Sequence, residues 1–284
     1  MKYQFLRFPE GKAKAVTLSY DDGCLQDLRF AELITGYGLK CTFNLCSDVC
    51  RSTPLTKEQV ETYFLSAGHE IAVHGALHRA EGNLRPIEGI RDILDCRLEL
   101  EERYGRIIRG MAYPDFGIRR MSCHTSYEAV KQYAKELDIV YCRTLGKDNN
   151  EFYLPEDWHC WMPTAHHNNP KLMDWIREFV EMDPSTIPYR ANRAPRLFYL
   201  WGHSFEFDRD NNWELVDAIG QNLGGREDIW YATNMEIYEY VTAYHSMIYS
   251  ADGRRIYNPT LHTVWFDVDG KLYTSHPGET LVID

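Results

Sequence analysis

The stretch HEIAVHGALH (69–78) holds three of the eleven histidines in this chain. His74 and His78 are four residues apart and follow a short apolar run that is typical of a β-strand. Residues at this spacing on a helical turn share one face, with Cβ atoms about 5–6 Å apart. Two imidazoles placed in this way can bind one cation. The pair therefore predicts a divalent-metal site that lacks an oxygen ligand, and a chance pair of surface histidines is the alternative.

Two adjacent carboxylates could supply that oxygen. Asp21 and Asp22 end an apolar run in TLSYDDG. Neighbouring carboxylates raise each other's proton affinity, and a cation relieves this cost. A solvated turn is the alternative, because Asp-Asp-Gly is a good turn sequence.

The elements that must position these residues alternate along the chain. Seven apolar runs rich in β-branched and aromatic residues predict short buried strands at 15–20, 41–46, 69–74, 107–113, 138–143, 196–203 and 229–233. Segments with one apolar face predict helices at 87–98, 127–137, 171–182, 212–223 and 235–247. Such alternation implies parallel strands joined by right-handed crossovers. A further strand is expected between residues 143 and 196, with 158–167 as the candidate.

The tail has a different pattern. Asp269-Gly270 between alternating runs predicts a β-hairpin. We therefore expect an incomplete or distorted (β/α)7 barrel as residues 1–249, with a small C-terminal antiparallel β appendage, residues 250–284, packed on it. The length of 284 residues fits one barrel-sized domain with such an addition.

Composition restricts the partners. The formal charge of −11 argues against nucleic acid or an anionic membrane. The chain has no long apolar stretch, and its N-terminus has no apolar region of the kind found in secretion signals. Eight cysteines occur without any C-x-x-C pair, which favours reduced thiols over a zinc finger. The expected location is therefore the cytoplasm.

In a parallel barrel, the carboxyl ends of the strands carry the active site. The predicted strands end at or just before Asp21, His74, Arg143 and His203. Polar side chains competent for chemistry are therefore expected to converge on one rim of the barrel.

At this point the sequence resembles the polysaccharide deacetylase family, also called the NodB homology domain or carbohydrate esterase family 4. TLSYDDG resembles the T-F-D-D-G motif, HGALH resembles H-[ST]-x-x-H, and KCTFNL (40–45) resembles the K-A-T-F-F stretch. LFYLWGHSFEF (197–207) resembles the late motif that ends in a catalytic histidine. The resemblance implies an incomplete (β/α)7 barrel that binds one divalent metal and hydrolyses N-acetyl or O-acetyl groups on sugars.

The resemblance also implies roles for individual residues. Asp21 corresponds to the general base and His203 to the general acid. The main-chain N–H of Phe116 corresponds to an oxyanion donor. The metal ligands correspond to Asp22, His74 and His78. One ion per chain is expected, with zinc preferred and cobalt, manganese or nickel also fitting this O/N/N donor set.

The chain departs from the family at several positions. Tyr113 stands where the family has an arginine, and Arg143 from the next strand could supply that charge or form a structural ion pair. Tyr113 and Trp201 are expected to contact the substrate. Glu206 could orient His203, but a surface-loop role is preferred for it and for Asp208. A polar loop is likewise the preferred interpretation for His166 and His167, and a solvated helix face for Asp27.

Three functions compete on these grounds. The first is a metal-dependent deacetylase of an acetylated carbohydrate. The second keeps the fold and the metal but takes a small non-sugar amide in the cytosol, as an allantoinase does. The third is a barrel that binds a glycan without catalysis. The oligomeric state stays open.

Overall fold

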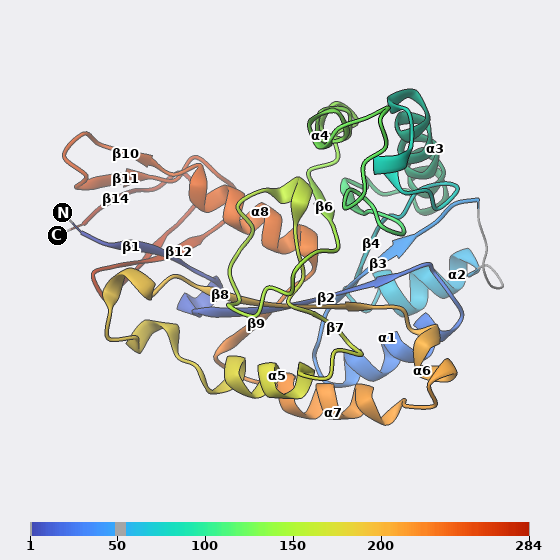
Figure 1. Ribbon diagram of the computed structural model, residues 1–284. Coiled ribbons are helices and arrows are strands. Elements are labelled where there is room, and N and C mark those ends of the chain that lie inside the picture. The colour runs from blue at the N-terminus through green and yellow to red at the C-terminus, as the bar shows by residue number, and fades with distance from the viewer. Residues whose placement is uncertain (1, 49–54, 284) are drawn as a thin grey trace.

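The computed structural model describes residues 2–48 and 55–283. Its centre is a curled sheet of parallel strands in the order β6-β5-β4-β3-β2-β8-β7, with β9 paired to β2 (Figure 1). The strands are β2 (Lys14–Asp21), β3 (Cys41–Leu45), β4 (Glu70–Val73), β5 (Gly110–Ala112), β6 (Tyr141–Arg143), β7 (Ala165–His166), β8 (Arg196–Gly202) and β9 (Ile229–Tyr231). Each of the seven expected strands is present, and the incomplete (β/α)7 barrel is confirmed.

The segment 158–167 lies between the two edges of this sheet. Trp161 forms a parallel bridge with Arg143 at the end of β6, and β7 pairs with β8 a few residues later. The regular strand contains only two residues, which explains its faint signal in the sequence. The segment thus connects β6, at one edge of the sheet, with β8 near the other edge. It does so without a continuous ladder of main-chain hydrogen bonds.

Helices surround the sheet on its outer side (Figure 1). They are α1 (Gln26–Gly36), α2 (Lys57–Val60), α3 (Pro86–Tyr104), α4 (Tyr127–Glu136), α5 (Leu172–Glu181), α6 (Phe205–Arg209), α7 (Glu214–Leu223) and α8 (Asn234–His245), with a π-helical turn, Glu61–Leu65, after α2. The longest, α3, begins at Pro86, where the missing N–H costs nothing, and ends at Gly105 in the left-handed conformation. The five expected helices are present, and no bounds were predicted for α1, which contains the helix face expected at Asp27, or for the shorter α2 and α6.

Antiparallel strands form the additional part of the molecule, on the left of Figure 1. Strands β1 (Gln4–Arg7), β12 (Val264–Val268) and β13 (Lys271–Ser275) form one sheet, and β10 (Ile248–Tyr249), β11 (Arg255–Tyr257) and β14 (Thr280–Val282) form another. The predicted hairpin is confirmed, with positive φ at both Asp269 and Gly270. Because β1 pairs with β12, strands from both ends of the chain share a sheet. The division after residue 249 stays a prediction.

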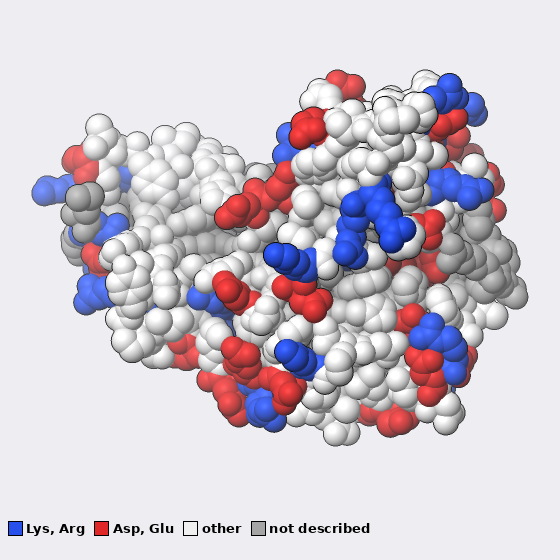
Figure 2. Space-filling model, in the orientation of Figure 1, with Lys and Arg blue, Asp and Glu red and all other residues white. Residues whose placement is uncertain are grey.

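The surface carries small groups of both charges. Acidic and basic side chains are interspersed over the face in Figure 2. None of the described helices is long and apolar enough to cross a membrane. The seven cysteines within 2–48 and 55–283 are free thiols, and Cys50 lies outside the described residues.

Candidate metal-dependent active site

The carboxyl ends of the barrel strands surround a cavity of about 310 Å³. Its lining includes eight of the nine residues that the sequence singled out: Asp21, His74, His78, Tyr113, Phe116, Arg143, Trp201 and His203. The ninth, Asp22, follows Asp21 directly. The predicted convergence on one rim is therefore present in the structure.

Three side chains form a candidate metal cluster. One ligand atom each from Asp22, His74 and His78 lies within 4.8 Å of the others. Asp22 Oδ1 is 3.6 Å from His74 Nε2 and 3.3 Å from His78 Nε2. Neither carboxylate oxygen of Asp22 has a hydrogen-bond partner among the described residues, although both are buried. A divalent cation would satisfy this carboxylate, so the residues present fit such an ion.

The loops after β2 and β4 create this geometry. Asp22 has φ of 82°, a left-handed conformation that turns its carboxylate toward the histidines. The histidine pair lies on a loop rather than the expected helical turn, with Gly75 at φ 75° and His78 at φ 51°. His74 Nδ1 lies 2.8 Å from the carbonyl oxygen of Ala112. That carbonyl can only accept, so the proton is on Nδ1 and Nε2 is free for a metal.

Asp21 is held by two donors, one from the adjacent strand β3 and one from β6 at the edge of the sheet. Arg143 Nη2 donates to Asp21 Oδ2, and Asn44 Nδ2 donates to Asp21 Oδ1 over 2.8 Å. The Arg143 side chain is 1% exposed, so the pair is fully buried. Burial alone would raise the pKa of Asp21, but the positive charge of Arg143 and the nearby histidines outweigh it and lower the pKa. Arg143 thus lies within hydrogen-bonding reach of Asp21, as either a replacement for the missing arginine or a structural ion pair requires.

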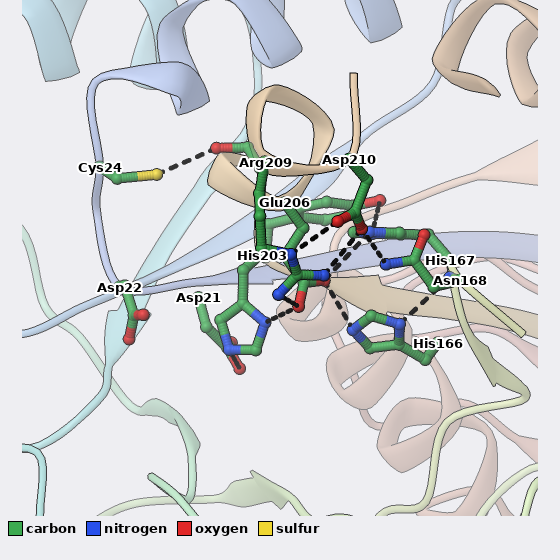
Figure 3. A network of polar contacts seen from close by, with 12 residues as sticks. Asp21, Asp22, Cys24, His166, His167, Asn168, His203, Glu206, Arg209 and Asp210 are labelled. Atoms are coloured by element: carbon green, nitrogen blue, oxygen red, sulfur yellow. Dashed lines mark hydrogen bonds and ion pairs between the residues drawn. The ribbon is translucent and has the colours of Figure 1, made fainter. Parts of the chain in front are cut away.

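His203 faces Asp21 from the end of β8. Its Nε2 is 3.9 Å from Asp21 Oδ2, and its Nδ1 is 3.8 Å from Glu206 Oε1 (Figure 3). Burial alone would lower the pKa of His203, but the contact with Glu206 and the charges of Asp21 and Asp22 outweigh it and raise the pKa. The lining of the cavity therefore holds a carboxylate and an imidazole close to each other.

The three residues expected at the substrate differ in exposure. Phe116 is 47% exposed, and Arg120 stacks on its ring. Trp201 is half-buried, and the guanidinium of Arg143 lies 4.6 Å from its ring centroid. The Tyr113 hydroxyl is buried and donates to the carbonyl of His159. Its ring lines the cavity while its hydroxyl is engaged elsewhere.

Several polar residues at the site were misjudged or missed. The surface-loop interpretation of Glu206 was wrong, because its side chain is buried and contacts His166 and His167. Asp27 is fully buried and accepts from Ser204, so a solvated helix face was also wrong. The sequence analysis assigned no role to Asn44. A polar residue inside the apolar run CTFNLC could have indicated that its side chain has a specific partner.

Asp115 is a further missed residue. Its Oδ1 lies 3.7 Å from His78 Nδ1, on the side of the ring away from Asp22. A carboxylate behind a metal-binding imidazole is the usual second-layer partner that fixes the ring. The sequence offered no periodic signal for it, because Asp115 lies in a turn with φ of 50°.

Fold and cluster together define the class: a barrel protein with a candidate divalent-metal site at the carboxyl ends of its strands. Residues 9–139 match the family model described as polysaccharide deacetylase. This match, over 131 of the 284 residues, agrees with the family resemblance that the motifs indicated. A comparison with curated proteins found no match.

Solved structures share the fold. A candidate polysaccharide deacetylase from Mycobacterium smegmatis is 17% identical, with a TM-score of 0.54 over 86% of this chain and 96% of that one. A family 4 acetyl xylan esterase from Clostridium thermocellum, solved with a cobalt ion, is 16% identical, with a TM-score of 0.50 over 79% and 90%. Puue allantoinase is 12% identical, with a TM-score of 0.56 over 84% and 93%. At these identities the likeness shows the fold alone.

Proposed function

We propose that this protein is a divalent-metal-dependent hydrolase that removes acetyl groups from an acetylated carbohydrate. The observation that carries the proposal is the buried Asp22 carboxylate without hydrogen bonds, facing His74 and His78 beside a second carboxylate, Asp21. An acetyl xylan esterase that shares the fold was solved with a cobalt ion, which is consistent with the proposed need for a metal. Zinc is the proposed ion, and cobalt, manganese or nickel suit the same ligands.

A bound ion would supply Lewis acidity, which acidifies a water molecule and polarises an acyl oxygen. The chain's own residues then move the protons. Asp21, fixed by Arg143 and Asn44, accepts a proton from the attacking water. His203, whose Nε2 lies 3.9 Å from Asp21 Oδ2, donates a proton from Nε2 to the leaving amine or alkoxide. The main-chain N–H of Phe116 is the proposed donor to the oxyanion.

The size of the cavity favours a second candidate. At about 310 Å³ it is at the small end of ligand pockets, which suits one sugar unit or a small amide. Puue allantoinase shares the fold, and its name indicates a small amide substrate. An amidohydrolase of small amides would use the same ion, base and acid.

The test is a substrate screen on the zinc-loaded protein. Acetate release from acetylated mono- and oligosaccharides is measured beside ammonia or acid release from ureide-type amides. The deacetylase predicts acetate from the sugars and no reaction with the ureides, and the reverse result favours the second candidate. If neither class reacts while the metal is bound, both candidates are contradicted, and binding of the same sugars without acetate release would support the glycan-binding barrel.

A further inference from the structure

Asp27 is a buried carboxylate that the proposed mechanism does not use. It lies in the first turn of α1 and is fully buried. It has no ion-pair partner among the described residues, in contrast to Asp21, which is paired with Arg143. Burial raises the pKa of Asp27 to about 7, and the negative charges of Asp22 and Asp21 add to this effect. A carboxylate at this place therefore costs free energy, so its contacts require an explanation other than stability.

One oxygen of this carboxylate holds the loop that carries Asp22. The main-chain N–H of Cys24, two residues after Asp22, donates to Asp27 Oδ2 over 3.0 Å. In return, the main-chain N–H of Asp27 donates to the carbonyl oxygen of Cys24 over 3.0 Å. An acidic side chain that reaches back in this way resembles half of a capping box, which fixes the point where the chain enters a helix. The loop after β2 is thus attached to α1 just beyond Asp22.

This loop needs support, because its backbone is unfavourable. Asp22 has φ of 82° and Gly23 has φ of 69°, so two successive residues are left-handed. Such a conformation is costly for a residue other than glycine. It is also the conformation that turns the Asp22 carboxylate toward His74 and His78. A contact that stabilises the turn therefore also fixes the position of the carboxylate.

The other oxygen of Asp27 reaches the loop after β8. Ser204, which directly follows His203, donates from Oγ to Asp27 Oδ1 over 2.6 Å. Cys24 Sγ lies 3.0 Å from the same Oγ, a contact drawn as the dashed line from Cys24 in Figure 3. All three side chains are buried. One carboxylate thereby joins two loops that end at the candidate active site.

We propose that Asp27 is the positioning residue for Asp22: it fixes the loop after β2 in the conformation that turns the Asp22 carboxylate toward the two histidines. The inference rests on the proposed function, because it assumes that Asp22 holds the divalent ion. Asp27 belongs neither to the candidate metal cluster nor to the lining of the cavity. Any effect of its loss on the ion must therefore pass through the loop.

The bond to Ser204 distinguishes this role from that of a helix cap. A cap needs only the main-chain N–H groups at the start of its own helix. Ser204 comes from a different strand end, 177 residues further along the chain. A second contact between the same two helices lies at the surface, where Gln26 Nε2 donates to Asp208 Oδ2 over 2.8 Å. Asp208 has no printed bond to Cys24 or Ser204, so it offers a matched control.

The test measures zinc affinity, because this quantity does not depend on turnover. Asp27→Ala removes both acceptor oxygens and should weaken zinc binding about 10–100-fold. Asp27→Asn keeps the size of the side chain and one acceptor oxygen, so it should restore most of the affinity. Asp208→Asn should leave the zinc affinity unchanged. Urea unfolding of each metal-free variant separates a loss of the fold from a loss of the site.

Cobalt provides a second readout. The visible spectrum of the cobalt-loaded protein reports the ligands of the ion, and Asp27→Ala should change it while Asp208→Asn should not. Ser204→Ala removes only one of the two bonds to Asp27, so it should weaken zinc binding less than Asp27→Ala does.

The results separate this inference from the proposed function. If the unchanged protein binds one zinc ion and Asp27→Ala binds it equally tightly, with the same cobalt spectrum, the inference is overturned and the proposed function stands. Equal losses of zinc affinity in Asp27→Ala and Asp208→Asn also overturn the inference. If the unchanged protein binds no zinc or cobalt, the proposed function and the inference are both contradicted.

Discussion

The two adjacent aspartates differ in their nearest neighbours, although His74 Nε2 lies 3.9 Å from Asp21 Oδ2 and 3.6 Å from Asp22 Oδ1, and this difference supports the separate roles proposed for them. Asp21 contacts Arg143 and Asn44, whereas Asp22 contacts His74 and His78. Motif spacing identified these residues because ligands on short loops stay close in sequence. Asn44 and Glu206 could not be assigned in this way, since their contacts to Asp21 and His203 exist only once the strand ends are assembled.

Separate substitutions should distinguish the two aspartates. Asp21→Asn keeps the shape of the side chain and should retain zinc, but should lose about 10²–10⁴-fold in kcat because the proton acceptor is gone. Asp22→Asn should instead weaken zinc binding, with activity partly restored by excess zinc. The measurements are kcat and zinc affinity for each variant. If Asp21→Asn loses zinc and Asp22→Asn retains it, the assigned roles are reversed.

Arg143 should control the acid side of the pH profile. Its charge lowers the pKa of Asp21, so the base is ionised at lower pH than it would otherwise be. Arg143→Met should raise the pKa of Asp21 and move the acidic limb of kcat/KM to higher pH. Arg143→Lys, which keeps the charge, is the control and should move this limb less. Equal profiles for Arg143→Met and the unchanged protein would show that the ion pair is structural only.

At the scale of elements, the strand ends and the loops after them place the chemistry. The seven strands were predictable because buried parallel strands are continuous apolar runs. Strand β1 was not, since its pairing with β12 joins the two ends of the chain. The loop conformation of the histidine pair was also missed, because spacing alone does not distinguish a helical turn from a glycine-containing loop.

Gly75 tests the importance of that loop. It has φ of 75°, and a Cβ there would overlap the carboxylate of Asp92 on α3. Gly75→Ala should cost more than the roughly 1–2 kcal/mol expected for left-handed strain alone, and should weaken zinc binding. Gly105→Ala is the matched control, with φ of 62° and open space around the added methyl group. Unfolding free energies and zinc affinities of both variants are compared, and equal losses would contradict the role given to Gly75.

At the scale of the whole molecule, the antiparallel strands and the barrel share apolar contacts. Phe266, Val264 and Val268 of β12 pack in one cluster with Ala243 of α8 and with Met247, which follows that helix. Pairing of β1 with β12 adds a main-chain connection between the two parts. Barrel and appendage should therefore unfold together.

Urea unfolding of the full chain should show one cooperative transition, and deletion of residues 250–284 should lower its midpoint. The deletion removes the partner of β1 and exposes the apolar surface of Ala243 and Met247. Fluorescence and circular dichroism should report the same midpoint in the full chain. Two separated transitions, or a deletion variant as stable as the full chain, would instead support independent domains.

The central claim is that one divalent ion held by Asp22, His74 and His78 is required for deacetylation. The most direct measurement is acetate release from an acetylated oligosaccharide as zinc is added stepwise to metal-stripped protein. The account predicts no release without zinc, a rise that ends at one equivalent per chain, and no rise in the His74→Ala, His78→Ala double variant. Acetate release from the metal-stripped protein would contradict the claim. Acetate release by the double variant after one equivalent of zinc is added would contradict it as well.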